Sequence, residues 1–164
     1  MHLNIKTLTI NVGRPAPALA SALFSSLFRD DAEDRVSGEV TMRPIIGEYV
    51  PGQGGVFVGD FRGDDGSICG LILAECDLGT KTWGPSGAIE GLSEWDGLAN
   101  TKALIAKGGY SAAKAAAEYT LDGHSDFYLP SRRELQLAAA NVPHLCKPEY
   151  HWSSTPRGDY TWAV

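Results

Sequence analysis

The pattern of hydrophobic and polar residues predicts a mixture of strands and helices, and its clearest signal lies between residues 123 and 135. Phe127–Leu129 is a short apolar run typical of a buried strand, and Pro130 ends it because proline has no N–H for a sheet ladder. Ser131 and Glu134 have the spacing of a capping box, in which each side chain bonds the backbone N–H of the other residue. The stretch therefore predicts a strand, a corner and a capped helix in immediate succession.

Two further pairs of segments have a clear pattern. Val56–Val58 and Ile68–Ala74 are apolar runs separated by a polar turn with glycines, which predicts a β-hairpin. Helices are expected over Asn100–Lys107 and Ser111–Tyr119, with a break at Gly108–Gly109 between them. The expected capping residues are Asn100 or Thr101 for the first of these helices and Ser111 for the second.

The N-terminal part of the chain has its own pattern. Leu3–Val12 alternates and is rich in β-branched residues, which predicts a strand, although the pattern leaves open which face is buried. Ala18–Phe28 places leucine and phenylalanine on one helical stripe. We therefore expect residues 1–44 to form a strand–helix arm for attachment or oligomerisation, and residues 45–164 to form the main domain. The helix of the arm can pack on its own main domain or on another subunit.

Composition and charge narrow the classes of protein. A chain of 164 residues with 43% hydrophobic and 21% charged residues is typical of a globular protein that buries a core. The net charge of −6 argues against binding to nucleic acid or to anionic lipid, because both need a basic surface. No apolar run approaches about 20 residues, so we expect no membrane insertion. The three cysteines match no zinc pattern and are expected to be small buried residues.

The sequence has no recognisable catalytic constellation or metal-binding pattern. The glycines at 52–55 are not followed by the lysine and helix of a phosphate loop, and the acidic turn at 60–65 lacks EF-hand spacing. His124 lies near Asp126, but a turn histidine with Asp126 bonding local backbone is the favoured interpretation. We therefore expect no enzyme activity, no cofactor and no metal.

Trp83 and Trp95 lie in a polar loop that is rich in glycine. Tryptophans in such loops either anchor the loop to the core or form part of a ligand-binding face, and anchoring is the favoured interpretation for both.

Four motifs, in this order along the chain, resemble the C-terminal domain of the Legionella collagen-like adhesin and its relatives, many of which are carried by phages and prophages. The resemblance covers about Pro44–Val164. Its motifs are IGEYVPGQGGVFVGDFRG with ICGLILAE, GLANTKALI with YSAAKAAAEY, DGHSDFYLPSRREL, and YHWSST with YTWAV.

The resemblance implies an α+β, C-type-lectin-like fold with a small twisted antiparallel sheet, two helices and long loops. Strands beginning at Trp152 would present the ligand face, although Trp152 and Trp162 can also be core residues. Family members usually continue with another strand, which here is either missing or replaced by Leu3–Val12. The calcium-binding triplets of sugar-binding lectins are absent from the sequence. The residues that the resemblance assigns to ligand binding are Tyr150, His151, Arg157, Asp159, Tyr160 and Trp162.

The function that the resemblance implies is a non-enzymatic, virion-associated binding protein of a phage or prophage. It would recognise a bacterial surface glycan or protein, as an adhesin or tail fibre does. It would contact other virion proteins through the arm and form a homo-oligomer, by analogy a trimer. Such a protein is made in the host cytoplasm and acts outside the cell as part of the virion. The alternative is a structural virion protein, a capsid decoration or fibre component, without ligand binding.

Overall fold

The computed structural model describes residues 10–13, 44–63, 65–85, 89–146, 148–157 and 160–163, with residues 10–13, 157 and 160–163 described in backbone only. All of these residues belong to one compact unit. The expected helix at Ala18–Phe28 lies outside the described residues. The boundary between arm and main domain at residue 44 therefore stays a prediction.

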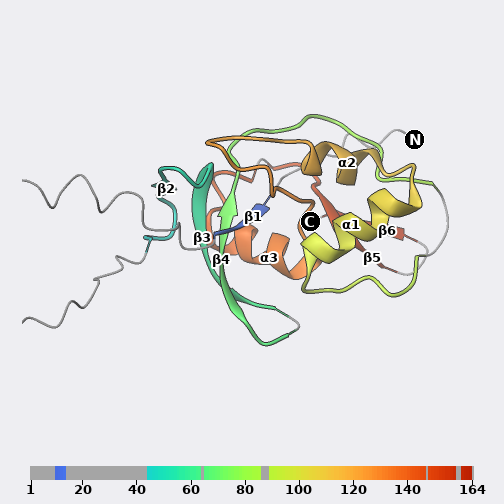
Figure 1. Ribbon diagram of the computed structural model, residues 1–164, viewed down its shortest axis with the longest axis horizontal. Coiled ribbons are helices and arrows are strands. Elements are labelled where there is room, and N and C mark those ends of the chain that lie inside the picture. The colour runs from blue at the N-terminus through green and yellow to red at the C-terminus, as the bar shows by residue number, and fades with distance from the viewer. Residues whose placement is uncertain are drawn as a thin grey trace, which may run out of the picture. The chain divides into compact units, whose positions relative to one another are not determined.

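A four-stranded antiparallel sheet has the strand order β1-β4-β3-β2 (Figure 1). The predicted hairpin is confirmed as β3 and β4, and β3 extends further toward the turn than the apolar run alone predicts. The end of the predicted N-terminal strand is β1, which pairs with β4 at an edge of the sheet. The strands are β1 (Ile10–Gly13), β2 (Tyr49–Val50), β3 (Gly55–Arg62) and β4 (Ile68–Leu73).

The predicted capping box is confirmed at the start of helix α3 (Arg132–Asn141). The Ser131 hydroxyl accepts a bond from the Glu134 N–H, and the Glu134 carboxylate accepts one from the Ser131 N–H. Phe127–Leu129 are buried as predicted, but they form no named strand. The hydroxyl of Thr101 bonds both the N–H and the C=O of Leu129, so a side chain replaces the strand partner that the pattern predicted.

The other two helices are α1 (Gly97–Lys107) and α2 (Ser111–Ala117), and the predicted caps of both are wrong. Helix α1 begins three residues earlier than expected, with Asp96 as its N-cap. Asn100 lies inside α1 and is buried, because it bonds groups outside the helix. Helix α2 has no side-chain cap, since the Ser111 hydroxyl donates to the Thr82 carbonyl oxygen instead, at 2.7 Å.

Two hydrophobic clusters hold these elements together. The first lies between the sheet and α3, and the second joins α1 and α2 to β5 (Trp152–Arg157), which pairs with β6 (Tyr160–Ala163) in a two-stranded sheet (Figure 1). Short side chains allow the close packing of α2, whose buried residues are Ala112, Ala113 and Ala116. The second cluster matters most for the site, because it supports the loop that leads into α1.

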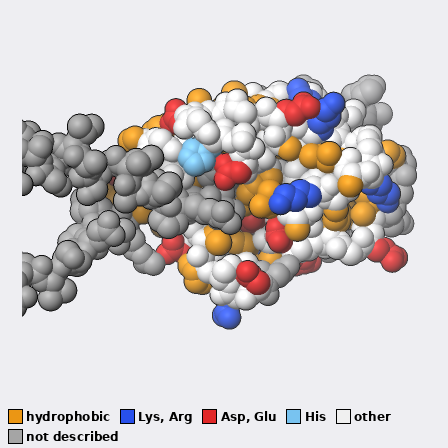
Figure 2. Space-filling model, viewed as in Figure 1, with side chains coloured by type: hydrophobic (Ala, Val, Ile, Leu, Met, Phe, Trp, Pro, Cys, Tyr) orange, Lys and Arg blue, Asp and Glu red, His pale blue; other side chains and the backbone are white. Residues whose placement is uncertain are grey.

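The fold is α+β, with a small antiparallel sheet and three helices among the described residues, where the resemblance implies two. The cysteines are all free, and Cys76 is exposed, so the expectation that all three are buried is wrong. Among the described residues, no helix combines the length and hydrophobicity that crossing a membrane requires. Figure 2 shows acidic and basic side chains interspersed with hydrophobic ones on the face turned to the viewer.

Candidate functional site

The six residues predicted to bind a ligand fall, along the chain, in or beside the segments that form β5 and β6. Tyr150 is 59% exposed just before β5, whereas the next residue, His151, is buried and offers a ligand almost no surface. The backbones of Arg157 and Tyr160 are paired across the hairpin. Asp159 and the side chains of the remaining predicted residues lie outside the described part of the chain, so this site stays a prediction.

Two tryptophans are core residues that fasten the glycine-rich loop to β5. Trp83 is buried, and its indole N–H donates to the carbonyl oxygen of Ser153 at 2.7 Å. Trp152 is also buried, and its indole N–H donates to the carbonyl oxygen of Lys81 at 2.8 Å. The anchoring interpretation is thus confirmed for Trp83, and the core interpretation is confirmed for Trp152.

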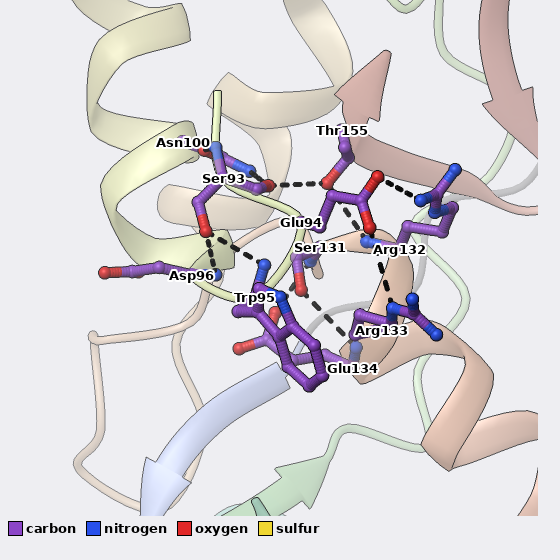
Figure 3. A network of polar contacts seen from close by, with 10 residues as sticks. All are labelled: Ser93, Glu94, Trp95, Asp96, Asn100, Ser131, Arg132, Arg133, Glu134 and Thr155. Atoms are coloured by element: carbon purple, nitrogen blue, oxygen red, sulfur yellow. Dashed lines mark hydrogen bonds and ion pairs between the residues drawn. The ribbon is translucent and has the colours of Figure 1, made fainter. Parts of the chain in front are cut away.

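Trp95 differs from both, because 43% of it is exposed. The ring of Phe61 lies 5.8 Å from the Trp95 ring, and the Arg133 guanidinium lies 5.1 Å from it in a cation–π arrangement. Glu94 forms ion pairs with both Arg132 and Arg133, the latter at 3.6 Å (Figure 3). We call Phe61, Glu94, Trp95 and Arg133 the Trp95 platform.

The backbone beneath the platform is held by a dense set of hydrogen bonds (Figure 3). The Ser93 hydroxyl accepts from the N–H groups of Trp95 and Asp96, at 2.9 and 3.0 Å. The side chain of Asn100 accepts from the Ser93 N–H and donates to the Ser93 C=O, both at 2.7 Å. Thr155 of β5 donates to the same carbonyl at 2.8 Å. An exposed indole is therefore presented by a backbone that is fixed before any ligand arrives.

Replacing Asn100 with alanine should release this loop. Its amide nitrogen also donates to the Ser154 hydroxyl at 3.1 Å, so the change removes three hydrogen bonds from a buried position. Unsatisfied buried groups cost energy, and we expect a loss of about 2 kcal/mol in the free energy of unfolding. Urea denaturation measures it. Asn141→Ala, which removes one bond to Val58 from an exposed residue, should have a clearly smaller effect. Equal losses for the two variants would contradict the role given to Asn100.

The buried carboxylate of Glu134 joins α3 to the platform loop, which is the Ser93–Asp96 segment that carries Trp95. Oε2 of Glu134 accepts from the Ser131 N–H at 2.6 Å and from the Gly97 N–H at 3.2 Å. Oε1 accepts from the Tyr128 hydroxyl at 2.9 Å. Gly97 is the first residue of α1 and lies two positions after Trp95. One side chain therefore ties the end of the platform loop to the start of α3.

Burial raises the pKa of Glu134 from its ordinary value of 4.5 to about 7, and the nearby Asp96 carboxylate adds to the rise. The hydrogen bonds from Ser131 and Tyr128 act in the opposite direction, because they favour the ionised carboxylate. Burial and the Glu134 carboxylate together raise the pKa of the Tyr128 hydroxyl well above its ordinary value. The tyrosine hydroxyl therefore stays neutral at any pH near neutrality.

The polar contacts that His124 makes within the described part of the chain connect two turns and form no catalytic arrangement with a nucleophile. His124 Nδ1 lies 3.2 Å from Asp126 Oδ1, and its Nε2 lies 2.7 Å from the Gly52 carbonyl oxygen, so Asp126 bonds the histidine ring rather than local backbone. This contact fastens one exposed turn to another. In the described residues, no group of three or more histidine, cysteine, aspartate or glutamate side chains is arranged to hold a metal ion.

The sequence indicates only part of this site. Its loop composition makes Trp95 a candidate residue, but the sequence analysis does not predict its neighbours Glu94 and Arg133. The available signals were the two adjacent arginines at the start of α3 and the acidic residues that flank Trp95. Neither signal shows that these charges meet, because they are separated by more than thirty positions in the chain.

Comparisons with known proteins found no protein-family model, no curated protein and no solved structure that matches this chain.

Proposed function

We propose that the protein is a non-enzymatic binding module with a C-type-lectin-like arrangement, associated with a phage or prophage virion, that recognises a component of a bacterial surface. The α+β architecture, the β5–β6 hairpin and the long loop before α1 support the proposed arrangement. The observation that carries the proposed function is the Trp95 platform: an exposed aromatic side chain on an immobilised loop.

Rigidity is what makes the platform suited to binding. A ligand that contacts a mobile loop must order it, at a cost of about 1 kcal/mol for each flexible side chain that it immobilises. The Ser93–Asp96 backbone is already held by α1 and β5 through Asn100 and Thr155. Binding at Trp95 therefore loses little affinity to the ordering of this loop.

The chemical groups of the platform suit a ligand with both polar and apolar surface. Indole and phenyl rings supply apolar contact area, and tryptophan and arginine are enriched where binding energy is concentrated. Arg133 has five N–H donors and Glu94 has several acceptor positions, so their mutual ion pair leaves both able to bond a ligand. A surface glycan and a surface protein both offer such a combination.

Replacing Trp95 with alanine should abolish most of the binding. Labelled wild-type protein would be applied to a panel of bacterial strains and to a glycan array. Loss of a central aromatic contact commonly costs about 2 kcal/mol or more, so we expect affinity to fall about 30-fold. The matched control is Ile105→Ala, because Ile105 is 42% exposed and lies on the opposite end of α1 from the platform loop. It should bind like the wild type.

The other outcomes separate the alternatives. Loss of binding in Tyr150→Ala, with Trp95→Ala unaffected, would place the ligand on the terminal strands and not on the platform. Wild-type protein that binds no strain and no glycan would overturn the binding module. The structural virion protein without a ligand would then be the better proposal.

A further inference from the structure

The Trp95 platform and Glu134 are connected through a single residue, Gly97. The Gly97 N–H donates to Glu134 Oε2 at 3.2 Å, and Gly97 directly follows the segment that carries Trp95. We propose that Glu134 is a positioning residue for the platform, and that a proton on Glu134 loosens the Trp95 loop by weakening this bond. The inference extends the proposed function, since it names what regulates the same site.

The fit around Gly97 shows how tightly the two parts are coupled. A Cβ at this position would clash with Glu134 Oε2 and would lie 2.6 Å from the Ser131 nitrogen and 2.8 Å from the Leu129 oxygen. The start of α1 thus packs directly on the corner that begins α3. Because no side chain lies between them, a change in the carboxyl group acts directly on the backbone of Gly97.

The ionised and neutral forms of Glu134 hold Gly97 differently. An ionised carboxylate accepts three hydrogen bonds here, and bonds to a charged acceptor are about twice as strong as neutral ones. In the neutral acid, Oε2 is a weaker acceptor for the two backbone N–H groups. The proton fits best on Oε1, where it can donate to the Tyr128 oxygen. Protonation therefore reverses the bond between Glu134 and Tyr128, with the Tyr128 oxygen now accepting, and reduces the strength with which Gly97 is held.

Three residues affect the protonation of Glu134 most directly, besides its burial. Tyr128 comes from the corner segment, Asp96 is the N-cap of α1, and Ser131 is the N-cap of the helix that carries Glu134. Burial is the main cause that brings the pKa of Glu134 to about 7, and the Asp96 charge acts in the same direction. Both forms are then populated near neutral pH, which an exposed capping glutamate would not show.

A ligand-free NMR titration between pH 5 and 9 tests the inference directly. The probes are the backbone N–H of Gly97 and the indole N–H of Trp95. We expect both signals to move with a common midpoint near pH 7 in the wild type. In Glu134→Gln, whose amide resembles the neutral acid, both should stay near their low-pH positions throughout. The matched control is Glu118→Gln, an exposed residue of an ion pair with Lys114, which should titrate like the wild type.

A second variant distinguishes positioning from a merely structural cap. Tyr128→Phe removes a hydrogen bond that lowers the pKa of Glu134, so the midpoint of both signals should move to higher pH. A Gly97 signal that titrates while the Trp95 signal stays fixed would overturn the inference, because Glu134 would then be a local cap only. Absence of any titration in the wild type would overturn it as well.

Binding shows the functional consequence. If the wild type binds a strain or glycan, its affinity should be about fivefold higher at pH 8 than at pH 5.5, and Glu134→Gln should remove this dependence. Failure of the proposed function would appear as no binding at either pH while the NMR titration persists. Failure of this inference would appear as binding with the same pH dependence in the wild type and in Glu134→Gln.

Discussion

Replacing Gly97 with alanine is expected to destabilise the protein by about 4 kcal/mol, because the added methyl group has no space. Its Cβ would lie 2.6 Å from the Ser131 nitrogen and 2.8 Å from the Leu129 oxygen, and both of these are backbone atoms that cannot rotate away. To relieve the clash, α1 must move away from the corner that begins α3. This movement breaks the bond from Gly97 to Glu134 and exposes part of a buried carboxylate network.

Urea denaturation of the Gly97→Ala variant measures this effect as a lower midpoint. The matched control is Gly63→Ala in the β3–β4 turn, where the nearest atom to a new Cβ is the carboxylate tip of Asp65, at 3.0 Å. That side chain is exposed and can shift at the cost of its hydrogen bonds to Ser67, so the control should change the free energy of unfolding by only about 1 kcal/mol. If the two variants are equally stable, the start of α1 is not packed on Glu134 as closely as the structure indicates.

The features that could be predicted from the sequence are those that depend on near neighbours in the chain. The capping box needs only Ser131 and Glu134, and both of its bonds are present. The β3–β4 hairpin needs two apolar runs and a turn, and it too is present. In each case the residues that determine the structure lie close in the chain: three positions apart in the capping box, and at most 17 in the hairpin, where Val56 pairs with Leu73.

The features that could not be predicted depend on contacts between distant segments. Asparagine is favoured at helix N-caps, yet hydrogen bonds to Ser93 and Ser154 hold Asn100 inside α1 as a buried residue. Trp83 and Trp95 lie in the same loop and have similar neighbours in the sequence. Trp83 is buried by contacts with distant residues, including Tyr110 and the Ser153 carbonyl seventy positions away, while Trp95 remains partly exposed.

Glu134 combines both kinds of information. Its role in the capping box is local and predictable, whereas its bonds to Gly97 and Tyr128 bring it into a buried site. A capping glutamate is normally exposed and ionised without penalty. Here the same carboxylate is buried away from water. Its ionised form holds the Gly97 N–H more strongly, but it lowers the stability of the folded state because a buried charge is costly. Stability and rigidity of the platform are therefore expected to respond to pH in opposite directions.

The free energy of unfolding should therefore depend on pH through the protonation of Glu134. Its pKa is about 7 in the folded state, against an ordinary value of 4.5 in the unfolded chain. Between these values the folded state binds the proton more tightly. The proton on Glu134 therefore stabilises the folded state by about 3 kcal/mol. This stabilisation is fully present below pH 4.5 and is lost as the pH rises through about 7.

The measurement is the difference in unfolding free energy between Glu134→Gln and the wild type from pH 4.5 to 8. Taking the difference removes the contributions of the other titrating groups, which both proteins share. The glutamine can keep its oxygen on the two backbone N–H groups and donate from its amide to Tyr128, so the two proteins should be equally stable at pH 4.5. At pH 8 the variant should be the more stable by about 3 kcal/mol. A constant difference across this range would mean that burial does not perturb Glu134, and the proton-dependent control of the platform would lose its physical basis.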